Sequence, residues 1–276
     1  MFNAFPQPEA RLLVFEDATA LAREAARRVV AGAGRAVEAG AMFRVALAGG
    51  RTPLAAYRTL AADPYVASVH WDSVELFWSD ERFVPHEHPD SNYGAARAAL
   101  LAALPIRAAQ VHPIPTDTVS APVAAIAYQD RLRRVFGVEP PALPRFDLIL
   151  LGLGEDGHTA SLFPGAVPAS SPDSLVAATE APGGGAPRVT LTLATLNAAQ
   201  AVLFLVSGEA KAEALERTLK AKDPDPALPA TLIRPDRGKA FWLVDRAAAS
   251  RLDLPAAGPG APTPDIRPLP ASGPDR

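Results

Sequence analysis

Apolar residues cluster in short runs that alternate with amphipathic stretches along most of the chain. The runs are rich in Val, Ile, Leu and Phe, and several lack the polar alternation of a strand with one wet face. Burial on both faces is typical of parallel strands that helices cover on either side. We predict strands at Arg11–Phe15, Arg44–Ala48, Val74–Ser79, Phe146–Leu151, Val189–Leu193, Ala201–Val206 and Phe241–Val244.

The stretches between these runs carry helix signals. In residues 18–39 apolar residues recur on one face, and residues 122–136 begin with Pro122 and stop at Gly137. Proline suits the first turn of a helix and glycine the position just past its end. Alternating strands and helices predict an α/β fold: a single-domain, doubly wound, mostly parallel sheet with helices on both faces, in a modified Rossmann-like arrangement.

Composition changes this picture at the C-terminus. Over the 276 residues, 49% are hydrophobic and 21% charged, which is enough apolar surface for a sizeable core. The stretch from Pro255 to Arg276, however, holds seven prolines and three glycines. We therefore predict one folded domain over residues 1–253 and a disordered Pro/Gly-rich tail over residues 254–276.

Charge and cysteine content exclude several classes of protein. The formal net charge of −3 gives no sign of a general nucleic-acid binder. With no cysteine, the chain has no disulfide, thiolate zinc site or cysteine nucleophile, and it suits a reducing compartment. The sequence shows no signal-peptide pattern, and no apolar run approaches the ~18 residues of a membrane helix, so we expect a cytoplasmic protein.

Two polar segments follow predicted strands in the N-terminal half. Gly49-Gly50-Arg51-Thr52-Pro53 precedes a helical pattern, where glycines allow a close approach, Thr52 can cap the helix, and free N–H groups suit an anion such as phosphate. An ordinary turn between strand and helix is the alternative, and the spacing is not that of a Walker A loop. Asp80-Glu81-Arg82 forms either a solvated turn or a polar binding edge. His86 and His88 fall between prolines, which indicates an exposed turn and not a metal site.

The most informative segment runs from Phe146 to Gly165. It contains Gly-x-Gly-x-x-Gly at positions 152, 154 and 157 after a strand, the spacing of a dinucleotide fingerprint. We reject that reading, because Glu155 and Asp156 would lie where a pyrophosphate binds, and nearby prolines leave no room for the crossover helix. A glycine-rich loop that presents Asp156 and His158 at the functional edge of the sheet remains.

A fourth segment, Val206–Lys211, follows another strand. Lys211 falls in the first turn of a predicted helix, where the helix dipole disfavours a cation. An anion bound at this place would resolve the conflict. The alternative is a surface lysine partly offset by Glu209.

Together these segments resemble the 6-phosphogluconolactonase family. The match follows family order from about residue 11 to 250, and Gly152–Pro164 is its most specific part. Arg51 departs from the pattern, since many relatives carry serine there. The matching pieces are Gly49-Gly50-Arg51-Thr52-Pro53, Asp80-Glu81-Arg82, Ser91-Asn92, Leu151–Pro164, Arg188–Thr192 with Asn197, Gly208 with Lys211, and Leu228–Ala230.

The resemblance implies hydrolysis of 6-phospho-D-glucono-1,5-lactone to 6-phosphogluconate in the oxidative pentose phosphate pathway, without a metal or an organic cofactor. His158 is then the expected general base for water, and Asp156 either orients His158 or binds a sugar hydroxyl. Arg82, Lys211 and the Gly49–Thr52 loop are expected to hold the phosphate.

The resemblance also implies a wider substrate site. The oxyanion donors are expected near Gly49–Gly50 or Gly154–Gly157. The expected partner is the small-molecule substrate, with no nucleic acid and no membrane, and the protein would be a monomer or a small homo-oligomer. The remaining residues expected at the substrate are Asp80, Asn92, Gly154, Gly157 and Arg188.

Three rivals remain to be weighed. Glucosamine-6-phosphate deaminases share the fold and a similar loop, but Phe163 stands where they carry an additional catalytic glutamate. A non-catalytic sugar-phosphate sensor would need a DNA-binding module, for which the predicted domain leaves no space. A serine hydrolase lacks support because the sequence has no Gly-x-Ser-x-Gly elbow.

Overall fold

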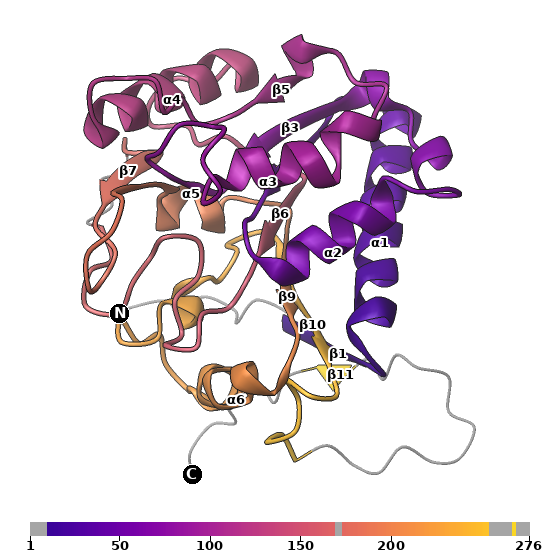
Figure 1. The fold of residues 1–276 in the computed structure, drawn as a ribbon, viewed down its shortest axis with the longest axis vertical. Helices are drawn as coiled ribbons and strands as arrows, with labels where there is room; N and C mark the ends of the chain where they lie inside the picture. The colour runs from indigo at the N-terminus through magenta and orange to yellow at the C-terminus, as the bar shows by residue number, and fades with distance from the viewer. Residues whose placement is uncertain (1–9, 169–172, 254–266, 269–276) are drawn as a thin grey trace, which may run out of the picture.

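A mostly parallel sheet runs through the centre of the molecule (Figure 1). The described residues of this computed structural model are 10–168, 173–253 and 267–268, and within them eight strands form the main sheet in the order β11-β1-β10-β9-β6-β2-β3-β5. Neighbouring strands are parallel except for β1 and β11. The strands are β1 (Ala10–Phe15), β2 (Phe43–Leu47), β3 (Val74–Trp78), β5 (Val111–His112), β6 (Leu148–Leu151), β9 (Ala201–Val206), β10 (Lys239–Asp245) and β11 (Arg267–Pro268).

The central strands explain why the hydrophobic pattern predicts this sheet. β6 is buried at all four of its positions, and β9 is buried at every position after its first residue. Such strands need cover on both faces, which the helices supply. The predicted doubly wound α/β fold is confirmed.

A second, smaller sheet is antiparallel and was not predicted. Within the described residues it contains β4 (Asp80–Arg82), β8 (Arg188–Leu191) and β7 (Val176–Thr179), in that order. The predicted strand Val189–Leu193 therefore exists as β8 but lies outside the main sheet, where the sequence analysis had placed it. The apolar run of β8 would be expected in either sheet, because a hydrophobic pattern predicts burial but does not identify the partner strand.

Helices cover the main sheet and pack on the small one. In Figure 1, α1 and α2 lie side by side along one flank, whereas α4 packs against β7 and β8. α4 ends at Gly137 with a left-handed backbone (φ 64°), as its sequence predicts. The helices are α1 (Ala18–Glu38), α2 (Arg51–Leu60), α3 (Asn92–Ala99), α4 (Ala121–Phe136), α5 (Leu193–Asn197) and α6 (Ala212–Lys220), with short 3₁₀ turns η1 (Val66–Ser68), η2 (Trp71–Ser73), η3 (Leu101–Ala103), η4 (Ala108–Gln110), η5 (Glu209–Lys211) and η6 (Pro229–Leu232).

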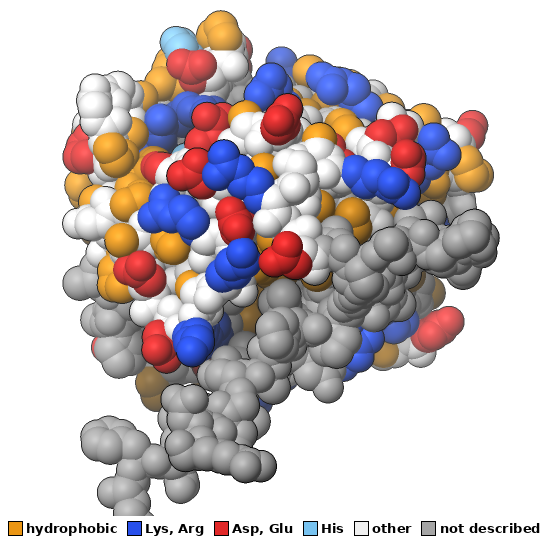
Figure 2. Space-filling model, turned by 90° about the horizontal axis from the view of Figure 1, so that it is seen from below, with side chains coloured by type: hydrophobic (Ala, Val, Ile, Leu, Met, Phe, Trp, Pro, Cys, Tyr) orange, Lys and Arg blue, Asp and Glu red, His pale blue; other side chains and the backbone are white. Residues whose placement is uncertain are grey.

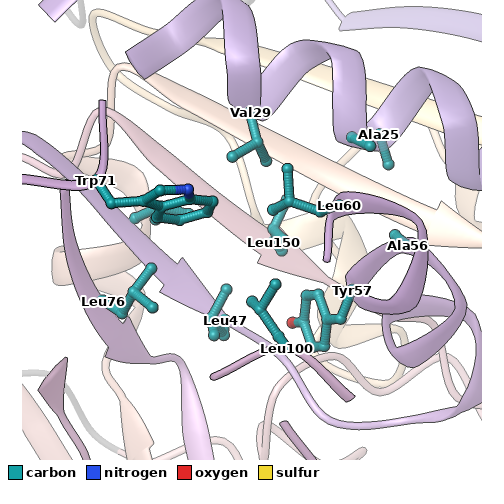
Figure 3. A pocket seen from close by; sticks show the side chains of 12 residues that line it. Ala25, Val29, Leu47, Ala56, Tyr57, Leu60, Trp71, Leu76, Leu100 and Leu150 are labelled. Atoms are coloured by element: carbon teal, nitrogen blue, oxygen red, sulfur yellow. The ribbon is translucent and has the colours of Figure 1, made fainter. Parts of the chain in front are cut away.

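The core between α1, α2 and the sheet contains a small apolar void. Its volume is only about 10 Å³, close to that of one water-sized probe, so it is a packing gap and not a ligand site (Figure 3). Tyr57 borders this void, and its hydroxyl accepts the Ala48 N–H and donates to the Ala48 carbonyl, both at 2.8 Å. Burial raises the pKa of Tyr57, which keeps the hydroxyl protonated. Tyr57 thereby ties α2 to the end of β2.

Part of the predicted tail is described. Arg267 and Pro268 form β11, whose backbone lies opposite Leu12 and Arg11 of β1. The other residues of the tail lie outside the described residues, so its disorder stays a prediction. No helix in the described ranges is long and apolar enough to span a bilayer. Figure 2 shows basic and acidic side chains interspersed on the face it presents, in keeping with the small net charge.

Candidate active site

An open cleft of about 660 Å³ lies where the loops after β2, β3, β6 and β9 meet. These loops leave the carboxyl ends of neighbouring parallel strands, which is where open α/β sheets bind their ligands. Eleven of the thirteen predicted site residues line the cleft: Gly49, Gly50, Arg51, Thr52, Asp80, Arg82, Asn92, Gly154, His158, Arg188 and Lys211. Asp156 and Gly157 are not among its lining residues.

His158 and Asp156 form a hydrogen-bonded pair on the loop after β6. His158 Nδ1 lies 2.6 Å from Asp156 Oδ1, and the same oxygen accepts the His158 backbone N–H at 3.0 Å. With Nδ1 engaged, Nε2 is the ring nitrogen without a protein partner among the described residues. The arrangement suits a histidine that exchanges a proton through Nε2 while a carboxylate holds the ring.

The pKa of Asp156 reflects this contact. Partial burial opposes its charge, but the backbone N–H, the positive charge and the ring hydrogen bond of His158 outweigh burial and lower the pKa below its ordinary value. Asp156 is therefore ionised at neutral pH. Its side chain contacts His158, which lines the cleft, and is not itself among the lining residues.

Two glycines shape this loop in different ways. A Cβ at Gly154 would lie 2.1 Å from His158 Nδ1 and 2.5 Å from Asp156 Oδ1, so only glycine lets the loop close around the pair. Gly157 has φ +89°, and its carbonyl accepts the Ala230 N–H at 3.1 Å. A Cβ at Gly157 would also meet Leu228 at 2.7 Å. Gly157 therefore fixes the loop against η6 and is not among the residues that line the cleft, so its substrate contact stays a prediction.

Arg82 and Arg188 face each other across the small sheet. They are direct partners in the antiparallel register of β4 and β8, where like charges repel. Burial, followed by the charge of Arg82, lowers the pKa of Arg188. Arg82 donates to the Asp90 carbonyl at 2.8 Å and to Asn92 Oδ1 at 3.0 Å. Neither arginine has a carboxylate within ion-pair distance among the described residues, so the pair favours an anion in the cleft.

Glu81 holds this arginine edge in place, a role that the sequence analysis missed. Its side chain is almost fully buried and accepts the backbone N–H groups of Arg82, Asn92 and Tyr93 at 2.7–2.8 Å, together with the Ser91 hydroxyl. Burial raises the pKa of Glu81, although the N–H groups that donate to it act in the opposite direction. Glu81 thus joins β4 to the first turn of α3.

Asn92 and Asp80 connect this edge to the neighbouring loops. Asn92 Nδ2 donates to the Asp80 carbonyl at 3.0 Å, and a Cβ at Gly49 would lie 2.0 Å from Asn92 Oδ1. Asp80 Oδ2 accepts the Ser161 hydroxyl at 2.7 Å. Ser161 was quoted in the sequence but given no role, because nothing in its local pattern indicates a partner 81 residues away.

The Gly49–Thr52 loop opens α2 toward the cleft. Gly50 is the N-cap, with φ +100°, and no side chain caps the helix. The expectation that Thr52 caps α2 is therefore wrong, because Thr52 lies within the first turn. Uncapped N–H groups at the start of a helix are donors for an anion.

Lys211 lies at the end of η5, on the loop after β9. Its Nζ is 3.5 Å from Glu155 Oε1, and its side chain is 24% exposed. Asp245, at the end of β10, supports this loop by accepting the Gly208 N–H at 3.0 Å and the Ser207 hydroxyl. Asp245 could not be predicted from the sequence, since the two groups of this loop that donate to it lie 37 and 38 residues away.

Comparison with known proteins assigns the family. The sequence pattern of the glucosamine-6-phosphate isomerases/6-phosphogluconolactonase family matches residues 16–242, most of the chain. The chain belongs to this family. The resemblance seen in the sequence is therefore confirmed.

Relatives within the glucosamine-6-phosphate isomerase/6-phosphogluconolactonase family match over most of their length. A 6-phosphogluconolactonase of a Nostoc species is 36% identical over 241 residues, or 87% of this chain and 98% of the relative. The Bos taurus 6-phosphogluconolactonase is 40% identical over 79% of this chain and 84% of its own. The solved 6-phosphogluconolactonase of Trypanosoma brucei superposes with a TM-score of 0.79 at 28% identity, over 90% of this chain and all of that chain.

Proposed function

We propose that the protein hydrolyses 6-phospho-D-glucono-1,5-lactone to 6-phospho-D-gluconate in the oxidative pentose phosphate pathway. The observation that carries the proposal is the Asp156–His158 pair beside a cleft lined by Arg82, Arg188 and Lys211. It provides a base for water and cations for a phosphate in one space. The names of the relatives agree with this activity. We further propose that the enzyme acts in the cytoplasm, as a monomer or a small homo-oligomer.

His158 carries the proton in the proposed reaction. Nε2 takes a proton from water as the water oxygen bonds to C1, and the carbonyl electrons move onto the carbonyl oxygen. When those electrons return, the bond between C1 and the ring oxygen breaks, and the ring oxygen takes the proton from the imidazolium. Asp156, ionised beside Nδ1, holds the ring in place and stabilises its positive form.

The cations of the cleft bind the charged parts of the substrate. Lys211, Arg82 and the N–H groups at the start of α2 are proposed to hold the phosphate, since ammonium, guanidinium and helix N-termini all suit its charge. Arg188 repels Arg82 in the free protein, so an anion between them relieves an unfavourable contact. Asp80 and Asn92 provide oxygens and an amide for sugar hydroxyls. N–H groups of the Gly49–Gly50 segment are proposed to receive the developing oxyanion. The alternative donors at Gly154 and Gly157 are disfavoured, because their N–H groups already donate to the carbonyls of His158 and Gly154.

The deaminase alternative is disfavoured at Phe163. This residue lines the cleft, and its ring lies 5.1 Å from that of His158. The deaminase segment has a catalytic glutamate at this position, and an aromatic ring cannot replace its carboxylate.

An assay with freshly prepared 6-phosphogluconolactone tests the proposal. The rate must be corrected for spontaneous hydrolysis, and we expect turnover well above that background. A rate equal to the background would refute the lactonase activity. Release of ammonia from glucosamine 6-phosphate in a parallel assay would instead support the deaminase.

A further inference from the structure

Lys211 differs from the other cations of the cleft in having a carboxylate partner. Its Nζ lies 3.5 Å from Glu155 Oε1. Arg82 donates to a carbonyl and an amide oxygen, and Arg188 to the Ala186 carbonyl, and neither forms an ion pair within the described ranges. In the free protein, Glu155 therefore already neutralises part of the positive charge of Lys211, the side chain proposed to bind the phosphate.

The position of Glu155 makes this pair easy to open. Glu155 belongs to the loop after β6 that also carries Asp156 and His158, whereas Lys211 follows the adjacent parallel strand β9. The Glu155 side chain is 64% exposed and that of Lys211 is 24% exposed. Glu155 can therefore turn into water at little cost, while Lys211 stays on the wall of the cleft.

A phosphate and Glu155 cannot both hold Lys211 without repelling each other. A phosphate monoester carries about −1.5 to −2 charges at neutral pH, which exceeds the single charge of a carboxylate. Lactone hydrolysis also adds a carboxylate, so the product is more negative than the substrate. The charge of Glu155, while it lies beside Lys211, thus opposes the more negative product more strongly than the substrate.

We propose that Glu155 competes with the substrate phosphate for Lys211 and so promotes release of the anionic product. This inference rests on the proposed function, in which Lys211 binds the phosphate. According to this proposal, Glu155 weakens the binding of anionic ligands to the cleft. Removing its charge should therefore tighten binding, which is the opposite of what loss of a ligand contact would do.

Calorimetric titration with 6-phosphogluconate tests the inference. Glu155→Gln should bind the product roughly two- to five-fold more tightly, the range expected for loss of one partly exposed ion pair. The product-inhibition constant in the lactonase assay should fall by the same factor. Glu209→Gln is the matched control: it removes the same charge from the turn that holds Lys211, at a residue without an ion pair in the described part of the chain. It should change binding much less.

A second pair of variants shows whether the effect passes through Lys211. Lys211→Met keeps the apolar stem and should weaken product binding, and adding Glu155→Gln to it should then give no tightening. Unchanged or weaker binding by Glu155→Gln alone would overturn the inference, as would equal tightening by Glu209→Gln. In those cases, weaker product binding by Lys211→Met would still support the proposed role of Lys211 in binding the phosphate. Wild-type affinity of a folded Lys211→Met variant would refute both the role of Lys211 in phosphate binding and the competition by Glu155. Melting curves of each variant test whether it is folded.

Discussion

Replacing Asp156 by asparagine tests whether this carboxylate acts through His158. An asparagine oxygen can still accept the backbone N–H and a proton from Nδ1, so the substitution removes charge while keeping shape. In the wild type Asp156 Oδ1 lies 2.6 Å from Nδ1 and 3.0 Å from the backbone nitrogen of His158. We expect Asp156→Asn to lower kcat and to leave KM nearly unchanged, because the lost interaction stabilises the imidazolium formed during the reaction.

The size of the effect follows from the exposure of the pair. A hydrogen bond to a charged group contributes about 1.5–3 kcal/mol. The side chains of His158 and Asp156 are 35% and 47% exposed, so solvent screens their interaction. We reduce the expected loss to about 1–2 kcal/mol, or roughly 5- to 30-fold in kcat. His158→Ala, which removes the base itself, should cost ~10²–10⁴-fold.

Initial rates on fresh 6-phosphogluconolactone, with spontaneous hydrolysis subtracted, measure both parameters. Asp72→Asn is a suitable control, since Asp72 is an exposed aspartate that pairs with Arg107 and does not line the cleft. A higher KM with unchanged kcat would show that Asp156 binds a sugar hydroxyl. A loss as large as that of His158→Ala would show that Asp156 does more than hold the ring. Either result refutes the reasoning.

Four further predictions follow from the same geometry. Lys211→Met should weaken 6-phosphogluconate binding by about 1.5–3 kcal/mol in calorimetry while sparing turnover of unphosphorylated gluconolactone; equal losses on both would exclude a phosphate contact. Gly154→Ala should lower kcat roughly 10²-fold by displacing the histidine, whereas Gly152→Ala, where a Cβ meets nothing within 4 Å, should lose far less; equal rates would contradict the close approach. Because folding lowers the pKa of Asp156, its contribution to the free energy of unfolding is present above the unfolded value of about 3.9 and lost as pH falls through the folded value. Urea titrations should therefore show wild type and Asp156→Asn converging in acid, and a gap that widens there would reverse the sign. A chain that ends at Asp253 should keep its activity and melting temperature, since a segment with the Pro/Gly-rich composition of the tail is expected to bury little; a large loss of either would mean that the pairing of β11 with β1 supports the fold.

Six strands of the main sheet could be predicted from sequence, because their apolar runs are long enough to stand out, whereas the two-residue strands β5 and β11 were missed. β6 and β9 show this pattern, and it depends on local composition alone. The small sheet could not be predicted, since the run that became β8 contains no signal for its partner β4. The hydrophobic pattern of a strand predicts which of its residues are buried, but not which strand or helix covers them.

The residues of the candidate active site also fall into those that the sequence could predict and those that it could not. The loop that holds Asp156 and His158 was predictable, because both residues and the glycine that admits them lie within five positions. Glu81 and Asp245 were missed, because the backbone N–H groups by which each joins two separate segments, those of Tyr93 and Gly208, reach it only in the folded chain. Their charge alone suggests a solvated turn. Contacts of this kind appear when distant segments meet, and no local pattern records them.

The facing arginines Arg82 and Arg188 also affect the protein as a whole. When the cleft is empty, burial of Arg188 and the charge of Arg82 in register with it both disfavour the charged guanidinium, a cost to folding that the nearby carboxylates of Asp80, Asp90 and Glu81 offset only in part. Any anion that binds only the folded chain lowers that cost and stabilises it, by about 2.7 kcal/mol at a hundred times its dissociation constant. The sugar phosphates present in the cell would then act as folding ligands, so that the supply of substrate helps to set how much native enzyme persists.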